Sequence, residues 1–206
     1  MLHYQTIDTP TLELLKQLMQ IPALENLRLV GGTGLALQKG HRKSVYIDLF
    51  GAIDADDIEL MNSLSVFNDL KTIQQTKNIK VFSINNIKTD IVNYPYPWLF
   101  PVIETSGIRL ADIRDVAAMK MAAITNRGTK KDFIDLYFLL HDFSVSEIVK
   151  FYLSKYHDGS DFMALRSLVY FSDAENDLMP ELLMPAEWES VKLKIKTEVE
   201  AFQGKA

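Results

Sequence analysis

Gly31, Gly32 and Thr33 form the first segment whose residue types could bind a phosphate group. They follow the apolar residues 27–30, which predict a short strand, and they open a predicted helix that ends at Gly40. Two glycines and a hydroxyl residue at the start of a helix allow backbone N–H groups to approach a phosphate closely. Gly-Gly is also common in ordinary turns, so this segment alone agrees with both a phosphate-binding turn and a structural one.

Asp48 is a candidate metal ligand on the next predicted strand. Residues 44–50 alternate so that Ser44, Tyr46, Asp48 and Phe50 share one face. The other face would carry Val45, Ile47 and Leu49. Phosphoryl and nucleotidyl transfer require Mg²⁺ held by carboxylates, because the metal neutralises phosphate charge and fixes the in-line geometry. Two carboxylates at positions i and i+2 of such a strand point the same way and can share metal ions.

Asp90 is a candidate carboxylate from a neighbouring strand. Residues 79–84 and 87–94 predict a β-hairpin, since Asn85 and Asn86 tolerate the positive φ of a tight turn. Asp90 lies in the second strand of this hairpin and could complete a metal site with Asp48. Taken alone, it agrees equally well with a solvated residue at the edge of a sheet.

The elements that must position these residues predict an α+β protein. Residues 1–107 combine strands with helices, including a helix from Asp54, as its N-cap, to about Leu70. Residues 108–206 are helical nearly throughout and form a second lobe, with a cleft expected between the two lobes. Residues 191–200 alternate in a strand-like way at first, but their Lys and Glu content favours a terminal helix at least as strongly.

Composition narrows the class of protein. The chain has 206 residues, 48% of them hydrophobic and 24% charged, which is typical of a globular protein. Its net charge of -5 gives no overall attraction to nucleic acid, so RNA binding would need a local basic patch. The absence of cysteine excludes disulfides and thiolate chemistry and agrees with a reducing cytoplasm. Neither a signal peptide nor a membrane span is predicted, so we expect a cytoplasmic protein without a membrane partner.

Three stretches together resemble one family. Residues 27–50, "LRLVGGTGLALQKGHRKSVYIDLF", resemble the opening of the abortive-infection toxin nucleotidyltransferases of the AbiEii-like family. Residues 112–140, "DIRDVAAMKMAAITNRGTKKDFIDLYFLL", are similar to the second signature of that family, and residues 168–192 are similar to its C-terminal region. The resemblance implies a nucleotidyltransferase-like N-terminal lobe with a mixed sheet and a role in phage defence. It also implies Mg²⁺-dependent transfer from a nucleoside triphosphate to an acceptor, which is RNA in some relatives, and a cognate antitoxin.

The resemblance assigns roles to individual residues. It makes Asp48 and Asp90 the Mg²⁺ ligands and, together with Lys120, the catalytic residues. The residues matched to nucleotide binding are Gly31, Gly32, Thr33, Arg42, Ser44, Arg127, Lys131 and Asp132. His41 and Asp135 also match family positions.

Tyr46 departs from the family pattern, because it occupies the place of the first of two aspartates. A phenol is neutral near pH 7 and is a poor Mg²⁺ ligand. We therefore expect transfer to be impaired, with a weak one-metal site at Asp48 and Asp90 still open to the protein. The alternatives are a degenerate member that binds a nucleotide, RNA or a protein without transfer, and a module that keeps only the fold.

The second signature also leaves alternatives open. Lys120 and Arg127 would share one face of a helix and could bind the triphosphate, or they could be solvated surface cations. Lys131 and Asp135 have the spacing of an exposed ion pair, which contributes little. Asp132 and Asp135 share a helical turn and could instead orient the basic residues.

Overall fold

The computed structural model describes residues 1–204 and has an α+β fold, with a sheet in the N-terminal region and helices in the C-terminal region. The sheet has seven strands in the order β3-β4-β5-β2-β1-β7-β6. In chain order the strands are β1 Leu27–Leu29, β2 Ile47–Gly51, β3 Leu70–Gln75, β4 Ile79–Ile84, β5 Ile87–Asn93, β6 Ile103–Thr105 and β7 Ile108–Leu110. The sheet is mixed, because β2 runs parallel to β5 and antiparallel to β1.

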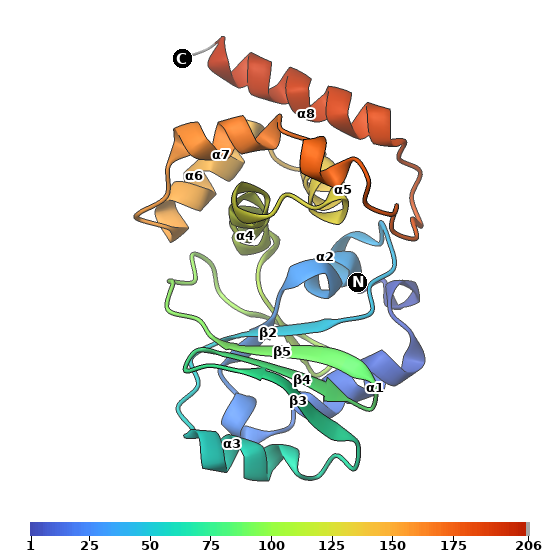
Figure 1. Ribbon diagram of the computed structural model, residues 1–206, viewed down its shortest axis with the longest axis vertical. Helices are drawn as coiled ribbons and strands as arrows, with labels where there is room; N and C mark the ends of the chain where they lie inside the picture. The colour runs from blue at the N-terminus through green and yellow to red at the C-terminus, as the bar shows by residue number, and fades with distance from the viewer. Residues whose placement is uncertain (205–206) are drawn as a thin grey trace.

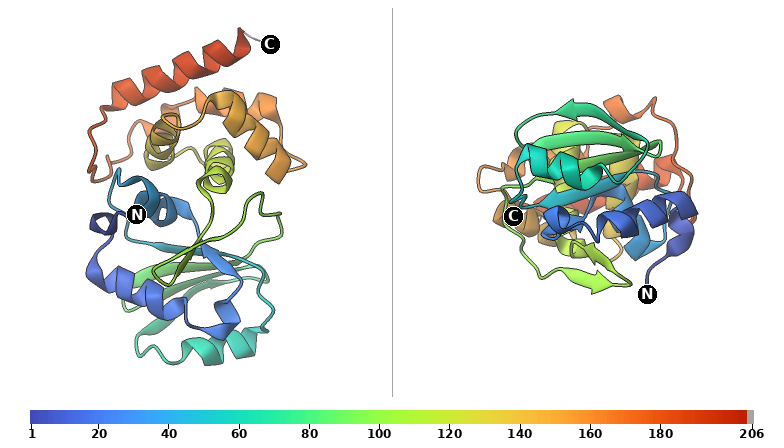
Figure 2. Two further views of the ribbon diagram at one scale, coloured as in Figure 1. Left: turned by 180° about the vertical axis from the view of Figure 1, so that it is seen from behind. Right: turned by 90° about the horizontal axis from the view of Figure 1, so that it is seen from below.

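The helices lie on both sides of the sheet (Figure 1). Those of the N-terminal region are α1 Thr9–Leu18, α2 Gly31–Lys39 and α3 Asp57–Leu64, with short 3-10 turns at Tyr4–Thr6 and Pro22–Leu24. Those of the C-terminal region are α4 Ile113–Asn126, α5 Lys130–Leu139, α6 Val145–Lys155, α7 Asp161–Leu168 and α8 Trp188–Gln203, with a 3-10 turn at Ser172–Ala174. Figure 2 shows α1 and α3 on one face of the sheet, while Figure 1 shows α2 between the other face and the C-terminal helices.

Two apolar cores explain this layering. One core packs α1 and α3 against the sheet residues that alternate inward, such as Leu29, Leu49 and Ile91. The other gathers the C-terminal helices around Phe133 and Phe138 and reaches Val30 and Leu35 at α2. Because successive strand residues point to opposite faces, Asp48 and Asp90 must face α2 and the C-terminal helices.

Two sequence expectations for the elements are wrong. The helix after β2 is capped by Asp56, whose carboxylate accepts the N–H groups of Ile58 and Glu59, whereas Asp54 accepts from the Asn26 side chain. That helix ends at Leu64 and not at about Leu70, and Leu70 is the first residue of the edge strand β3. Only pairing with β4 makes this segment a strand, since most of its side chains are exposed and lack a strand-like apolar alternation.

Other elements agree with the sequence. Asn85 and Asn86 have φ values of 51° and 64° and close the β4–β5 hairpin as expected. The C-terminal segment that alternates at first is the helix α8. The strand expected over residues 44–50 differs at its start, because β2 begins at Ile47 and residues 44–46 are not part of it. The sheet ends at Leu110, three residues beyond the lobe boundary expected at 107. Residues 205 and 206 of the expected second lobe lie outside the described residues.

Among residues 1–204, no helix is both long enough and apolar enough to cross a membrane.

Candidate active site

Asp48 and Asp90 are register partners on the neighbouring parallel strands β2 and β5. Partners in register on adjacent strands point to the same face of a sheet, so the two carboxylates lie side by side. Both side chains are half-buried on the face toward α2. The structure thus brings together two of the carboxylates that the sequence analysis selected from separate segments.

The start of α2 lies against Asp48. Gly31 has a φ of 63°, and a Cβ atom added there would lie 2.0 Å from Asp48 Oδ2. A Cβ on Gly32 would lie 2.4 Å from Arg42 Nη2. Only glycine can occupy these two positions without displacing a charged side chain, and the φ of Gly31 independently disfavours any L side chain. The two glycines therefore let Asp48 and Arg42 approach the backbone at the helix start.

Thr33 joins α2 to the segment before β2. Its hydroxyl donates to the carbonyl oxygen of Tyr46 and lies 2.8 Å from the Ser44 hydroxyl. Residues at the first turn of a helix have N–H groups without a partner in that helix, and the helix dipole favours an anion there. Helix α2 thus starts at Gly31 directly beside Asp48, and the free N–H groups of a helix start can bind an anion such as phosphate.

The charges around Asp48 oppose one another. Burial raises the pKa of the Asp48 carboxyl, and the negative charge of Asp90 raises it further. Lys120, Lys88 and Arg127 act in the opposite direction without cancelling the increase in pKa. Asp90 forms an ion pair with Lys88, with 2.5 Å between Nζ and Oδ1. Lys88 lies on the same face of β5 as Asp90, two residues earlier, and the sequence analysis did not select it.

Tyr46 lies immediately before β2, and 45% of its surface is exposed. The ammonium groups of Lys88 and Lys131 lie 5.7 Å and 5.8 Å from the centre of its ring. Both distances are within the range of a cation–π contact. Lys131 is in the first turn of α5, so this aromatic residue joins the sheet to the C-terminal helices through two lysines.

A cluster of buried charges surrounds Asp135 of α5, and its other members are His41, Arg42, Lys120 and Asp132; we call it the Asp135 cluster. Arg42 binds Asp135 with two N–H groups, at 2.6 Å from Nε to Oδ1 and 2.8 Å from Nη2 to Oδ2. Lys120 Nζ lies 2.6 Å from Oδ2, and His41 Nε2 lies 2.7 Å from Oδ1. The charges of Lys120 and Arg42 hold the pKa of the fully buried Asp135 carboxyl well below its usual range, although burial acts in the opposite direction.

Asp132 extends the same cluster. Its carboxylate lies 3.0 Å from Lys120 Nζ and 3.2 Å from Arg127 Nε, and it accepts from the Thr129 hydroxyl. Lys120 and Arg127 lower the pKa of the Asp132 carboxyl to about 2 despite its burial. Lys120 therefore bridges two carboxylates within one turn of α5, and 61% of the Arg127 side chain stays exposed.

His41 occupies the end of this network as a neutral imidazole. Burial lowers its pKa, and Nε2 contacts Asp135, so Nε2 carries the ring proton. Its Nδ1 atom has no hydrogen-bond partner among the described residues. A segment far along the chain fixes the backbone here: Leu183 and Met184 donate their N–H groups to the His41 carbonyl, and Lys43 donates to Glu181. His41 matches a family position in the sequence, but no sequence signal indicates this contact with residues 181–184.

Two of the alternatives for the second signature do not hold for Lys120 and Lys131. Lys120 is 5% exposed, so it is not a solvated surface cation. Lys131 and Asp135 do not form the exposed ion pair, because Asp135 is buried and binds Arg42 and Lys120 while Lys131 lies at the Tyr46 ring. The structure agrees with the third alternative, in which Asp132 and Asp135 orient basic residues.

The donor set at Asp48 and Asp90 does not fit a pair of metal ions. Within residues 1–204, no three His, Cys, Asp or Glu side chains lie together in positions that could hold a metal. Asp48 and Asp90 provide two side chains where such a group has at least three. The Lys88 ammonium is already the counterion of Asp90. A Mg²⁺ ion needs several oxygen ligands, and two half-buried carboxylates supply only some of them.

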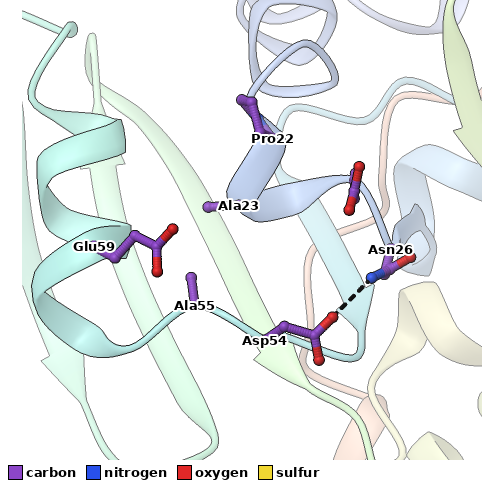
Figure 3. A pocket seen from close by; sticks show the side chains of 7 residues that line it. Pro22, Ala23, Asn26, Asp54, Ala55 and Glu59 are labelled. Atoms are coloured by element: carbon purple, nitrogen blue, oxygen red, sulfur yellow. Dashed lines mark hydrogen bonds between the residues drawn. The ribbon is translucent and has the colours of Figure 1, made fainter.

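A separate pocket of about 260 Å³ lies between Pro22–Leu24 and α3 (Figure 3). Glu25, Asp54 and Glu59 are among its lining residues, and Asp54 is held by the Asn26 side chain at 3.1 Å. It shares no lining residue with the Asp48 site.

Comparison with known proteins identifies the family of this chain. Residues 13–205 match the model of a family described as nucleotidyl transferase AbiEii toxin, type IV toxin–antitoxin system. The chain belongs to this family. A protein of Aquifex aeolicus (strain VF5), described as uncharacterized, is 30% identical over 196 residues, which cover 92% of this chain and 94% of that protein.

Solved structures share the fold of this AbiEii family member. The nucleotidyltransferase toxin MenT4 of Mycobacterium tuberculosis H37Rv is similar with a TM-score of 0.60 at 15% identity, over 91% of this chain and 83% of MenT4. JHP933 of Helicobacter pylori gives a TM-score of 0.56 at 16% identity, over 97% and 94% of the two chains. The antibiotic-resistance factor ANT(2'')-Ia gives 0.57 at 12% identity, over 71% and 91%. At these identities the likeness concerns the fold alone.

Proposed function

We propose that the protein binds a nucleoside triphosphate in the cytoplasm and that its transfer of the nucleotide to an acceptor is impaired by Tyr46. RNA is the acceptor class that we propose to test first. The observation that carries this proposal is the register pair Asp48–Asp90 directly beside the glycine turn that opens α2. Membership of a nucleotidyltransferase toxin family supports the reaction class.

In this proposal each residue of the site has a role that follows from its position. The N–H groups of Gly31, Gly32 and Thr33 would bind phosphate oxygens at the start of α2. Arg127, which is half exposed and lies near Asp48 and Asp90, would attract the triphosphate. Asp48 would accept the proton of the attacking hydroxyl at a carboxylate oxygen, since burial and Asp90 raise its pKa.

Lys120 would act as a positioning residue in this proposal and not as a ligand of the triphosphate. Its ammonium contacts the carboxylates of Asp132 and Asp135. Asp135 in turn binds Arg42, whose guanidinium lies beside Gly32. Substitution of Lys120 would then disturb the glycine turn indirectly, through Arg42.

Mg²⁺ is the element of this proposal that the donor set supports least. Asp48 and Asp90 would be its only protein carboxylates, and a bound Mg²⁺ would neutralise phosphate charge. A neutral phenol at Tyr46 adds no charge to the site. We therefore propose weak Mg²⁺ binding and impaired transfer.

The alternative function is nucleotide or RNA binding without transfer. It is favoured by the two lysines at the exposed Tyr46 ring, because an aromatic face with flanking cations suits a base and its phosphate. A type IV toxin–antitoxin family also implies an antitoxin as a functional partner.

Titration with each nucleoside triphosphate, followed by transfer of labelled nucleotide to bulk RNA, tests the proposal. The wild type should bind a triphosphate and transfer it slowly, and Tyr46→Asp should transfer faster. Asp48→Ala should abolish transfer, whereas Asp54→Ala, an exposed carboxylate outside the site, should leave it unchanged. A wild type as fast as Tyr46→Asp would show that Tyr46 does not impair the site. Binding without turnover in both proteins would favour the alternative.

A further inference from the structure

Lys88 forms an ion pair with Asp90, one of the two carboxylates of the Asp48–Asp90 pair. It precedes Asp90 by two residues on β5, so both side chains project from the same face of the strand. Its Nζ atom is 2.5 Å from Asp90 Oδ1, and 41% of the side chain is exposed. The ion pair therefore reaches solvent on one side and the carboxylates on the other.

The strand register places Lys88 opposite Tyr46. The pairing of β2 with β5 begins at Ile47 with Thr89, and Tyr46 and Lys88 are the residues that precede these two partners. The ammonium lies 5.7 Å from the centre of the Tyr46 ring. Lys88 thus has an aromatic ring on one side and a carboxylate on the other.

Two neighbouring carboxylates favour a cation between them, since each raises the cost of ionising the other. In this chain the ammonium of Lys88 is already paired with Asp90, and its charge also acts on Asp48. A divalent ion would have to displace it from Asp90 and would be repelled by it afterwards. Only two carboxylates would hold such an ion in return.

We propose that Lys88 is the resident cation of this site: its ammonium takes the position of a divalent ion at the Asp48–Asp90 pair and binds the phosphates of the nucleotide without metal. The part concerning phosphate rests on the proposed function, whereas the part concerning metal does not. Lys88 is a binding residue here, with a role that the carboxylates alone cannot fill.

Lys71 provides a matched control. It forms an ion pair with Asp69, also two residues away, with 3.0 Å between Nζ and Oδ1. This pair lies at the edge strand β3, and 67% of the Lys71 side chain is exposed. Lys71→Met therefore removes an equivalent charge without touching the site.

The part of the inference that concerns metal is tested by titrating Mn²⁺ alone into the protein. The electron paramagnetic resonance signal of the free ion measures binding. Lys88→Met should bind Mn²⁺ about tenfold more tightly than the wild type, because the competing ammonium is gone. Lys71→Met should match the wild type, and Lys88→Met combined with Asp90→Asn should lose the gain. Equal affinities in the wild type and Lys88→Met, or no binding by either, would overturn the inference, as would a gain that survives Asp90→Asn.

Titration of a nucleoside triphosphate with and without EDTA tests the phosphate part. The wild type should bind equally in both conditions, while Lys88→Met should lose about tenfold in EDTA and recover when Mn²⁺ is added. A wild type that binds only with a divalent ion would contradict the inference. Failure of every protein to bind a triphosphate would instead reject the proposed function and leave the Mn²⁺ result to stand. Thermal melting of Lys88→Met beside Lys88→Gln checks that both variants are folded.

Discussion

The Asp135 cluster and the Asp48–Asp90 pair both lie near the start of α2, yet they differ in how far their negative charges are balanced by positive ones. Asp135 is fully buried and is contacted by Arg42, Lys120 and His41, which together hold its pKa low. Asp48 is half-buried beside another carboxylate, and its pKa is raised. One region has its charges compensated within the protein, and the other keeps a surplus of negative charge close to solvent.

The difference in charge compensation gives the two regions different roles. A compensated buried network contributes to a single arrangement of α4, α5 and residues 41–43, since removing any member leaves an unpaired charge. The Asp48–Asp90 pair is compensated only in part, by Lys88, so it costs stability in the folded protein and is available to a ligand, as is common at functional sites. Lys120, Asp132 and Asp135 of the second signature therefore belong to the compensated network and not to the Asp48–Asp90 pair.

The largest effect should come from Asp135→Asn. It leaves Arg42 and Lys120 buried beside a neutral amide, so we expect a loss of about 3–5 kcal/mol in the free energy of unfolding. Urea denaturation measures this loss. Asp142→Asn is the control, because Asp142 pairs with Lys39 at the surface and should cost less than about 1 kcal/mol. Similar losses in both variants would remove the distinction between the two regions.

Gly31→Ala should come next. A Cβ atom at Gly31 meets Asp48 Oδ2 at 2.0 Å, and the φ of 63° is itself strained for alanine. We expect a loss of about 2–4 kcal/mol, from strain together with the displaced carboxylate. Gly107→Ala isolates the strain, since its φ is 76° and nothing lies within 4 Å of its Cβ, so about 1 kcal/mol should be lost. Equal losses would mean that Asp48 does not press on Gly31.

Acid should weaken the Asp135 cluster in a defined range of pH. The pKa of Asp132 is lowered to about 2, so its ionised form stabilises the fold above its unfolded pKa. That contribution, about 2 kcal/mol, should be lost as the pH falls from about 4 to about 2. Urea denaturation across this range should show a smaller slope of unfolding free energy against pH in Asp132→Asn. An unchanged slope would place the acid sensitivity elsewhere.

Asp48→Asn should have the smallest effect and the opposite sign. The pKa of Asp48 is raised in the folded protein, so its charge opposes folding above its unfolded pKa. We expect the variant to gain about 1 kcal/mol in unfolding free energy at neutral pH. The gain should fade below about pH 4, where Asp48 is protonated in both states. A loss of stability at neutral pH would mean that Lys88 and Lys120 compensate Asp48 as fully as Arg42 and Lys120 compensate Asp135.

Much of the fold could be predicted, because local sequence decides it. The glycine turn, the hairpin at Asn85 and Asn86 and the C-terminal helices follow from backbone preference and apolar periodicity. Strand β3 could not, because residues 70–75 carry little apolar alternation and become a strand only through pairing with β4. The start of α3 was misplaced because Asp54 and Asp56 are equally suitable caps in the sequence.

For the candidate site, the sequence indicates Asp48 and Asp90 but not which side chains contact them. Asp48 and Asp90 were selected, and the register places them side by side. Lys88 was missed, although its position two residues before Asp90 on a predicted strand was a visible signal. Lys131 was paired with Asp135 by helical spacing, whereas packing turned Asp135 inward to Arg42 and left Lys131 at Tyr46.

The sequence by itself determined the kinds of elements, the glycine turn and the family, because these depend on neighbouring residues and on motifs in order. Only the tertiary structure decided which charges meet. The contact of residues 181–184 with His41, the closure of Arg42 on Asp135 and the pairing of Lys88 beside Tyr46 depend on strand register and helix packing. Such contacts form between residues distant in the chain or in different strands, and burial then amplifies each charge by excluding water.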